Sequence, residues 1–464
     1  MSKNVGISRS KSFKFRIKTS KWVLVKTFIK FSFLSIENNL YSFTYESCLV
    51  IIEFNILSFS YINIDILFSI LFNSNQIVLK NNLNFILENM NKQKISLKVD
   101  RAISELRRGG QIVISDFKTG ISVLLMAAEM VDRESINDIS QSTSSNPNLI
   151  LSSNRATALE LNTNNSPCSI IIDKEWSIDD ILSLCMPLYK HPIPKLNGVI
   201  FENLNSITSI CILLLRQARL LPAGIMSIIS NINIEKTCEW ATSRNYIYVE
   251  DSHVNSFEPH NSKNLTIAVR AKVPLEATSN SEIVVFRPKD GGNEHFCLLI
   301  GKSRNIKNNN DHSYSPLVRI HSQCITGDVL DSLKCDCGQQ LKESIKLMAK
   351  ADEGILIYLA QEGRDIGLLN KLRAYTLQED GMDTVEANLA LGFNDDERLY
   401  YPAKEILDLL DIKSIKLITN NPNKINHMSN LGIKITKRVP IKIKPNKHNE
   451  IYLQTKSNKS GHIL

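Results

Sequence analysis

The chain has 464 residues, of which 43% are hydrophobic and 22% charged, a composition typical of a globular protein with room for two or three domains. Its formal net charge is +8, but residues 1–30 contain nine Lys or Arg and no acid, so the rest of the chain sums to −1. Nucleic-acid binding by a folded domain requires a basic surface. The charge distribution excludes that function for the main body, and we expect no nucleic-acid partner.

Nine cysteines is an odd number, and most of them stand alone in apolar surroundings, as Cys185, Cys211 and Cys297 do. Secreted domains usually pair their cysteines in disulfides. The isolated cysteines predict buried thiols in a reducing compartment, and we expect a cytoplasmic protein.

Residues 1–89 are rich in Lys, Asn, Ile, Phe and Ser, and Gly6 is their only glycine. Their basic, acid-free start is typical of a targeting peptide, but no small-residue cleavage site follows. The apolar run Leu49–Phe72 includes Glu53 and Asp65, and a spanning helix of about 20 residues rarely tolerates such groups. We expect an extension without a function of its own and no membrane contact. A targeting segment and a membrane anchor are the alternatives.

Residues 97–260 alternate between helical and strand patterns, which predicts an α/β domain. Val99–Arg108 has apolar residues at helical spacing and is followed by two glycines that would cap a helix. Gln111–Ser115 predicts a strand, and Val123–Val131 a helix. The Ser- and Asn-rich stretch Ser140–Ser166 predicts a surface loop, and Leu221–Met226 a helix end that turns into a strand.

This second segment resembles 3,4-dihydroxy-2-butanone-4-phosphate synthase in its first helix and strand, in Met126-Ala-Ala-Glu129 and in the Leu-Pro-Ala-Gly turn that ends at Gly224. In that family, carboxylates in a loop after the first strand hold magnesium beside a sugar phosphate. The corresponding loop here has Asp116 as its only acid, and one carboxylate is a poor magnesium site. The Arg-x-x-Gly-His and His-Thr-Glu-Ala motifs of that family also have no counterpart in this segment. We expect a degenerate, inactive domain.

Residues 264–464 open with three predicted strands, Thr266–Arg270, Ile283–Phe286 and Phe296–Ile300. A polar loop, Ser303–Ser315, follows, and then a fourth strand, Leu317–Ile320. With the preceding segment, this predicts two consecutive domains of mixed α/β class, each with its own sheet.

Three cysteines follow that fourth strand within fourteen residues: Cys324, Cys335 and Cys337. Thiolates bind zinc, and a catalytic zinc takes three protein ligands where a structural zinc takes four. The spacing permits a catalytic site with these three cysteines. It also permits a structural site completed by His321, three residues before Cys324.

The residues from about 267 to 464 resemble GTP cyclohydrolase II over several long blocks. These are Arg319-Ile-His-Ser-Gln-Cys-Ile-Thr-Gly-Asp328, Ser332-Leu-Lys-Cys-Asp-Cys-Gly338, Gln361-Glu-Gly-Arg-Asp-Ile-Gly-Leu-Leu-Asn-Lys371, Asp383-Thr-Val-Glu-Ala-Asn388, Asp396-Glu-Arg398 and Thr419-Asn-Asn-Pro-Asn-Lys424. The resemblance implies the first step of riboflavin biosynthesis, hydrolysis of GTP to 2,5-diamino-6-(5-phosphoribosylamino)pyrimidin-4-one, formate and pyrophosphate.

The resemblance also implies one zinc ion per chain on the three cysteines, Mg²⁺ with the GTP phosphates, and a homodimer. The zinc would lower the pKa of its water toward about 7, and this water would attack C8 of guanine. The residues implied in GTP binding are Arg319, Ile320, His321, Ser322, Gln323, Gln340, Glu362, Gly363, Arg364, Thr384, Thr419 and Lys424.

Three catalytic residues are implied: Asp396 as proton acceptor, Arg398 as nucleophile at the α-phosphate, and Tyr375 near the reacting ring. A guanidinium is almost always protonated, so stabilising the departing pyrophosphate is chemically the easier role for Arg398. Tyr375 could instead be a packed residue of an amphipathic helix.

One residue departs from the expected His-Ser-Glu-Cys motif, because Gln323 stands where the resemblance predicts Glu. Gln keeps the size and one acceptor but loses the charge. If the Glu of the motif binds the guanine N1–H and N2 amine, Gln323 would weaken binding of GTP in the ground state. If that Glu only supports other substrate-binding residues, GTP binding would change little. We expect activity to survive. The alternatives to a cyclohydrolase are a bifunctional enzyme with an active front domain and an inactive regulator that binds zinc and GTP.

Overall fold

In this computed structural model, contacts divide the chain into two units, Met1–Leu83 and Asn84–Leu464. The structure describes residues 95–161, 163–196, 201–202, 204–257, 265–289, 291–308 and 314–449. The predictions for residues 1–89 lie outside these ranges, as do the last fifteen residues. In the described ranges no helix is long and apolar enough to cross a membrane.

The front domain, residues 95–257 as described, is built on a seven-stranded sheet in the order β5-β4-β3-β6-β2-β1-β7. Its strands are β1 (Ile112–Asp116), β2 (Ile121–Ala127), β3 (Asn148–Leu151), β4 (Cys168–Ile171), β5 (Phe201–Glu202), β6 (Ala223–Ile228) and β7 (Ile247–Glu250). The β1–β7 pair is parallel, and the other pairs in this order are antiparallel.

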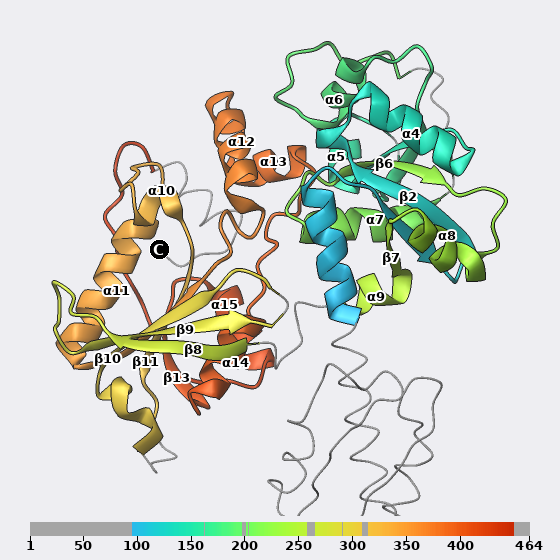
Figure 1. Cartoon of the computed structure of the whole chain (residues 1–464). Coiled ribbons are helices and arrows are strands. Elements are labelled where there is room, and N and C mark those ends of the chain that lie inside the picture. Colours follow the sequence, from blue (N-terminus) through green and yellow to red (C-terminus); the bar gives the residue numbers. More distant parts are fainter. Residues whose placement is uncertain are drawn as a thin grey trace, which may run out of the picture. The chain divides into compact units, whose positions relative to one another are not determined.

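Helices cover both faces of this sheet. One apolar cluster joins the strands to the helix over 95–107, to α7 (Asn205–Gln217) and to α9 (Asp251–Ser256). A second cluster on the opposite face includes α4 (Arg133–Thr143), α6 (Ile178–Cys185) and α8 (Thr237–Ser243). The front domain is therefore a layered α/β fold, in agreement with the predicted class (Figure 1).

Two predictions for the front domain were wrong. The segment 123–131, predicted as a helix, is mostly strand β2, which pairs with β1 in a hairpin, followed by the 3-10 turn Ala128–Met130. Both faces of β2 are buried, so its apolar residues run without the alternation that marks a half-exposed strand. The segment 140–166, predicted as a loop, contains the end of α4, strand β3 and helix α5 (Ser153–Ala158). Strand β3 is only four residues long, and a serine, a residue type also common in loops, forms the N-cap of α5. The composition of this segment therefore hid both elements.

The rear domain is built on a second seven-stranded sheet, in the order β14-β13-β11-β12-β10-β9-β8. Its strands are β8 (Leu265–Lys272), β9 (Ser281–Pro288), β10 (His295–Gly301), β11 (Leu317–Ser322), β12 (Glu353–Leu359), β13 (Ser414–Ile418) and β14 (Lys434–Val439). The predicted strands at 266–270, 283–286, 296–300 and 317–320 are confirmed. The predicted polar loop at 303–315 begins instead with a 3-10 segment, Lys302–Asn308.

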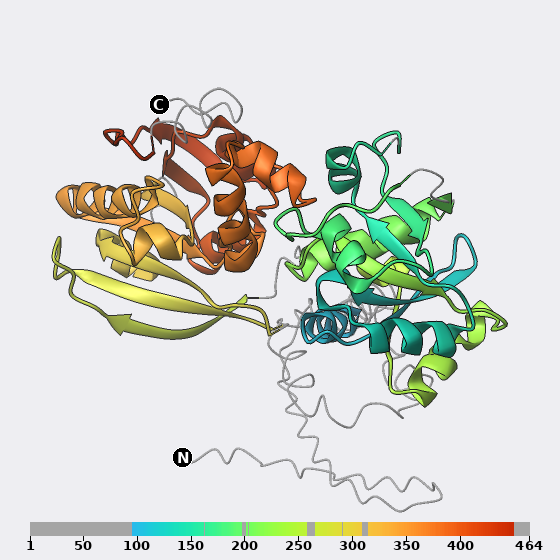
Figure 2. The ribbon, with the colours of Figure 1, turned by 90° about the horizontal axis from the view of Figure 1, so that it is seen from above.

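The two halves of this sheet differ in direction. Strands β14, β13, β11 and β12 are mutually parallel, whereas β12, β10, β9 and β8 are antiparallel. Strands β8 and β9 form the yellow edge of the sheet in Figure 2.

Helices connect the parallel strands. The chain passes from β11 through α10 (Ile325–Asp328) and α11 (Cys337–Ala351) to β12, and then through α12 (Gly367–Glu379), α13 (Thr384–Ala390) and α14 (Tyr401–Leu409) to β13. Helix α15 (Pro422–Asn430) leads to β14. Helix α11 packs on one face of the sheet, and α14 and α15 pack on the other (Figure 1). The carboxyl ends of β11, β12 and β13 therefore lie at one edge, where open α/β sheets place their ligands.

Candidate active site

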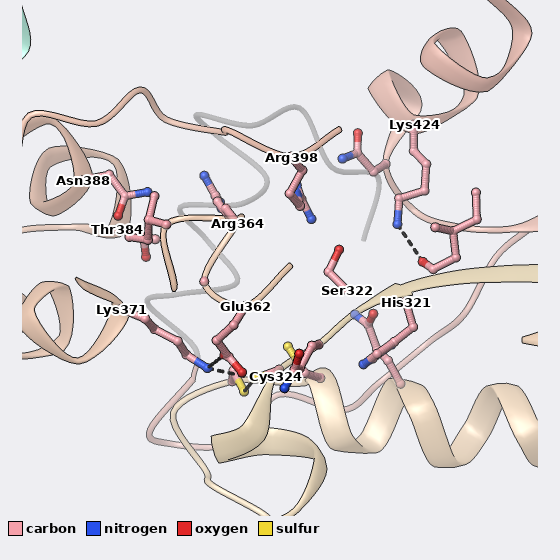
Figure 3. A pocket seen from close by; sticks show the side chains of 18 of the residues that line it. His321, Ser322, Cys324, Glu362, Arg364, Lys371, Thr384, Asn388, Arg398 and Lys424 are labelled. Carbon is pink, nitrogen blue, oxygen red and sulfur yellow. Dashed lines mark hydrogen bonds and ion pairs between the residues drawn. The ribbon is translucent and has the colours of Figure 1, made fainter. Parts of the chain in front are cut away.

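A pocket opens at this edge of the rear sheet (Figure 3). It brings together every residue that the sequence analysis singled out in the rear domain except Asp396, whose neighbour Arg398 does line the pocket. The lining residues are Arg319, Ile320, His321, Ser322, Gln323, Cys324, Cys335, Cys337, Gln340, Glu362, Gly363, Arg364, Ile366, Lys371, Ala374, Tyr375, Gln378, Thr384, Asn388, Arg398, Thr419, Asn420, Asn421 and Lys424.

The three cysteines converge on the floor of this pocket. All their sulfur atoms lie within 4.8 Å of one another, and the Sγ atoms of Cys324 and Cys335 are 3.7 Å apart. Two thiolates on a tetrahedral zinc, each with a bond of about 2.3 Å, stand roughly 3.8 Å apart. Cys337 is the first residue of α11, where the helix dipole favours a thiolate. The donor set therefore fits one zinc ion.

His321 does not join this cluster. Its Nε2 lies 3.0 Å from Asp328 Oδ1, and its ring stacks on Tyr358 at 5.5 Å between centroids. Burial lowers the pKa of His321, although the hydrogen bond to Asp328 opposes this effect. In the described part of the chain, the three cysteines alone form a group able to hold a metal. A structural site completed by His321 is therefore not supported.

A buried ion pair supports the metal-binding loop. Lys371 Nζ on α12 lies 2.6 Å from Glu362 Oε1, 2.8 Å from Thr326 Oγ1 and 3.1 Å from Cys324 Sγ. The other oxygen of Glu362 accepts a hydrogen bond of 2.7 Å from the backbone N–H of Ile325. Burial opposes the charge on Lys371, but the neighbouring Tyr375, Cys324 and Glu362 raise its pKa above the ordinary value. The ammonium thus remains charged beside the thiols.

The turn between β12 and α12 has an unusual backbone. Gly363, Arg364, Asp365 and Gly367 have φ values of +66°, +60°, +75° and +87°. Side chains with a Cβ rarely adopt such conformations, and where they do the surrounding structure has to hold them there. The carbonyl of Glu362 accepts hydrogen bonds from the N–H groups of Asp365 and Gly367, both at 3.0 Å. The turn presents Gly363 and Arg364 to the pocket.

Two arginines lie on the side of the pocket away from the cysteines. In Figure 3, Arg364 and Arg398 stand across the cavity from Cys324. Arg398 forms a two-pronged ion pair with Asp396, with its Nε 2.8 Å from Oδ1. Burial opposes the charge on Asp396, but Arg398 lowers its pKa below the ordinary value. At neutral pH Asp396 is a carboxylate that holds the guanidinium in place.

The carboxyl end of β13 supplies a further cation. Lys424 is the third residue of α15 and is buried, and its Nζ donates a hydrogen bond of 2.9 Å to the carbonyl of Ile320. Thr419 follows β13 directly, and its hydroxyl accepts a hydrogen bond of 3.0 Å from the N–H of Asn421. Thr419 and Lys424, which the resemblance implied in GTP binding, both line the pocket.

Comparison with known proteins agrees with this geometry. A family model described as GTP cyclohydrolase II matches residues 266–440. The chain is 37% identical over 372 residues to a GTP cyclohydrolase-2 of Azospirillum brasilense, covering 79% of this chain and 94% of that protein. It is 46% identical over 200 residues to a GTP cyclohydrolase-2 of Histophilus somni, covering 43% of this chain and 89% of that protein. This chain belongs to the GTP cyclohydrolase II family.

Two further similarities extend beyond the cyclohydrolase domain. The riboflavin biosynthesis protein RibBA of Endomicrobium trichonymphae is 41% identical over 256 residues, or 54% of this chain and 62% of that protein. A crystal structure of RibBX, a two domain 3,4-dihydroxy-2-butanone 4-phosphate synthase from A. baumannii, covers 75% of this chain and 99% of its own. Its identity is 15% and its TM-score 0.30.

Sequence reasoning missed several polar lining residues of this GTP cyclohydrolase II pocket: Lys371, Gln378, Asn388, Asn420 and Asn421. Lys371 ends a motif block and Asn388 another, so both were visible in the sequence without a role. A lysine on an amphipathic helix usually faces solvent, and nothing in the spacing showed that Lys371 is 8% exposed and bonded to Glu362.

Proposed function

We propose that this pocket binds GTP with the guanine ring beside the cysteine cluster and the phosphates beside Arg364, Arg398 and Lys424. As a member of the GTP cyclohydrolase II family, the chain is an enzyme of riboflavin biosynthesis. The observation that carries the detailed assignment is the convergence of three thiols with zinc-site spacing in a pocket that also contains cations on its other side. We expect the products to be 2,5-diamino-6-(5-phosphoribosylamino)pyrimidin-4-one, formate and pyrophosphate.

Cys324, Cys335 and Cys337 would hold the zinc and leave one tetrahedral position open. A zinc ion with three protein ligands supplies a Lewis acid and an activated water at neutral pH. The Lys371 ammonium partly offsets the negative charge of three thiolates on a divalent ion, which favours keeping all three deprotonated in a buried site.

The remaining residues would bind and orient the substrate. Gln323 and the imidazole of His321, which line the same pocket as the cysteines, would contact the guanine. The buried Nδ1 of His321 has no hydrogen-bond partner in the described structure, so a substrate group could satisfy it. Tyr375, whose hydroxyl lies 3.5 Å from Thr326 Oγ1, would close this end of the pocket.

The basic side of the pocket would stabilise the triphosphate. Arg398, held by Asp396, would offset charge on the pyrophosphate as it departs, because a paired and protonated guanidinium is a poor nucleophile. Magnesium would enter with the phosphates rather than on a cage of protein carboxylates. In the described residues the only metal-type cluster is the cysteine one.

The test is to incubate the full-length chain with GTP in zinc-containing buffer and to measure formate and bound zinc. We expect formate release with one zinc per chain. Cys335→Ser should lose both, whereas Cys238→Ser, at an exposed thiol of the front domain, should keep both. A wild-type chain with zinc but without formate release would contradict the enzymatic proposal. Zinc retained by Cys335→Ser would contradict the metal site.

A further inference from the structure

The face of the front domain that contacts the cyclohydrolase domain makes several hydrogen bonds to the segments that build the pocket. Its donors come from α5 and the adjoining Ser152, and from the end of α7 and the residues that follow. Their acceptors lie in two places, the strained turn after β12 and the end of α13 with the residues that follow it, and in the opposite direction Arg373 on α12 donates to Glu129 of the front domain. Both places contribute pocket residues. This coincidence suggests a role for a front domain that we expect to be inactive.

Arg219 holds the strained turn at both ends. Its guanidinium lies 2.6 Å from Asp365 Oδ1 and donates a hydrogen bond of 3.1 Å to the carbonyl of Ala360. Residues 360 and 365 flank the four residues from Gln361 to Arg364. Asn370 on α12 donates a hydrogen bond of 2.9 Å to the Arg219 carbonyl. Arg219 thus contacts the residue before the turn, the residue after it, and helix α12, which follows the turn.

The carboxylate of Asp365 depends on this contact. Burial raises the pKa of Asp365 to about 6, and the Arg219 guanidinium opposes that rise. The group is therefore mostly ionised at neutral pH while largely removed from water. Without Arg219, the turn would contain a buried charge that has lost its nearest cation, which strongly favours rearrangement of the backbone.

The end of α13 is capped by the front domain. The last carbonyls of a helix lack partners within the helix, and α13 has no basic residue in its last turn. Arg155 donates a hydrogen bond of 3.2 Å to the carbonyl of Ala390, the last residue of α13. Just beyond the helix, Ser152 donates one of 2.8 Å to the carbonyl of Gly392, and Asn154 one of 2.7 Å to that of Phe393. These three bonds fix the helix that presents Thr384 and Asn388 to the pocket.

Two further features show that this contact is closely fitted. Gly392 has φ +92°, and a Cβ there would lie 2.7 Å from Ser152 Oγ and 3.3 Å from Arg155 Cβ. Arg155 is 4% exposed and also donates to the carbonyls of Ser183 and Leu184, at the end of α6 in its own domain. The same guanidinium therefore caps one helix of each domain.

We propose that the front domain positions the GTP-binding surface of the cyclohydrolase domain, with Arg219 holding the 361–364 turn and Arg155, Ser152 and Asn154 holding α13. None of these residues lines the pocket, so they are positioning residues. The inference rests on the proposed function only in taking GTP as the ligand. The docking itself is a property of the two domains and can be measured without substrate.

The test compares full-length Arg219→Met and Asn154→Ala with the wild type. The matched control is Arg244→Met, a front-domain arginine that stacks on Trp240 at 4.6 Å. The measurements are kcat and KM for GTP, zinc content, and amide hydrogen exchange without substrate. Asn154→Ala removes only the bonds to Phe393 and Asn394, so it reports on docking even if Arg219→Met does not fold.

For Arg219→Met we expect a KM for GTP at least tenfold higher, a smaller change in kcat and an unchanged zinc content. For Asn154→Ala we expect a KM about threefold higher. Amide exchange should quicken at 360–367 in the first variant and at 390–395 in the second, and stay unchanged in Arg244→Met. Wild-type KM and wild-type exchange in both variants would overturn the inference. Absence of formate from the wild type would count against the proposed function alone, because the exchange result stands without it.

Discussion

At the scale of single residues, Gln323 is where this chain departs from the motif that its family resemblance leads us to expect. Its side chain lines the pocket directly before Cys324. The N1–H and N2 amine of guanine are both donors, and a carboxylate accepts from both whereas an amide offers one oxygen and presents its own N–H groups. Binding by Gln323 is therefore expected to be weaker than binding by Glu.

Gln323→Glu should accordingly lower the KM for GTP. A hydrogen bond to a charged group contributes about 1.5–3 kcal/mol, which corresponds to roughly tenfold or more in affinity. Steady-state formate release as a function of GTP concentration measures the change. Gln378→Glu, on the α12 side of the same pocket, is the control for added charge and should leave the KM near wild type. An unchanged or higher KM in Gln323→Glu would show that position 323 does not contact the guanine donors.

Lys371 is the residue whose role is clearest from the contacts. Lys371→Met keeps most of the side-chain length but leaves Glu362, which is 5% exposed, without its cation. Removing one partner of a buried ion pair costs about 3–5 kcal/mol, so the free energy of unfolding should fall by about 3 kcal/mol. Zinc should also be lost faster to a chelator, because Glu362 anchors the N–H of Ile325 beside Cys324.

Denaturant unfolding and zinc release measure these two effects. Lys346→Met on α11, where the lysine pairs with Glu343 in solvent, is the matched control and should change neither. A Lys371→Met protein that unfolds and retains zinc as the wild type does would mean that the pair has no structural role.

At the scale of helices and strands, the metal-binding loop depends on the close approach of α10 to the start of α11. A Cβ on Gly338 would lie 2.0 Å from the carbonyl oxygen of Gly327, which is backbone and cannot turn aside. A Cβ on Gly327 would in turn lie 2.7 Å from Cys335 Sγ. These two glycines let the loop fold tightly enough for the three sulfur atoms to converge.

Gly338→Ala should therefore separate the two helices and open the cysteine cluster. We expect less than half a zinc per chain and a matching loss of formate release, with a destabilisation of about 1–3 kcal/mol from overpacking. Gln339→Ala, at the exposed next position of the same helix, is the control and should retain both zinc and activity. Full zinc occupancy in Gly338→Ala would show that α10 and α11 can accommodate the added methyl group without separating the three cysteines.

The sequence predicted elements and site residues to different extents. The first four rear strands, β8 to β11, were predicted because turn-rich or polar segments separate their short apolar runs. Strand β2 was not, because burial on both faces removes the alternation by which a strand is recognised. The lining of the pocket could be anticipated where motif blocks end strands, as at Thr419. The bond from Arg155 to Ala390 joins residues 235 positions apart, and no local pattern encodes such a contact.

At the scale of the whole molecule, sequence motifs do not show what the front domain contributes to the cyclohydrolase domain. The match to the Azospirillum protein spans 372 residues, far more than the 175 residues of the family model, and therefore includes front-domain sequence. That relative is named for its cyclohydrolase activity alone. A front domain retained beside a cyclohydrolase, and bonded to its pocket segments, agrees with a supporting role.

The last prediction concerns the chemistry of the front domain, which we expect to be absent. Asp116, the last residue of β1, is the only acid of the β1–β2 hairpin, and its buried carboxylate accepts hydrogen bonds from Ser206 Oγ at 2.6 Å, Thr119 Oγ1 at 2.9 Å and the N–H of Lys118 at 3.0 Å. These bonds lower the pKa of Asp116 and occupy its oxygens, although burial opposes the shift. Magnesium needs several oxygen ligands in octahedral geometry, and this hairpin offers one carboxylate, which these hydrogen bonds already engage.

The full-length chain, incubated with ribulose 5-phosphate and Mg²⁺, should therefore form no dihydroxybutanone phosphate under conditions in which it releases formate from GTP. Mass spectrometry of the four-carbon product decides the matter, with the GTP reaction as an internal control that the preparation is active. Asp116→Asn should leave formate release within about twofold of wild type, because Asp116 does not line the cyclohydrolase pocket and the amide keeps the size and one acceptor oxygen. Any four-carbon product that disappears in Asp116→Asn would make the front domain a second enzyme, and this chain bifunctional.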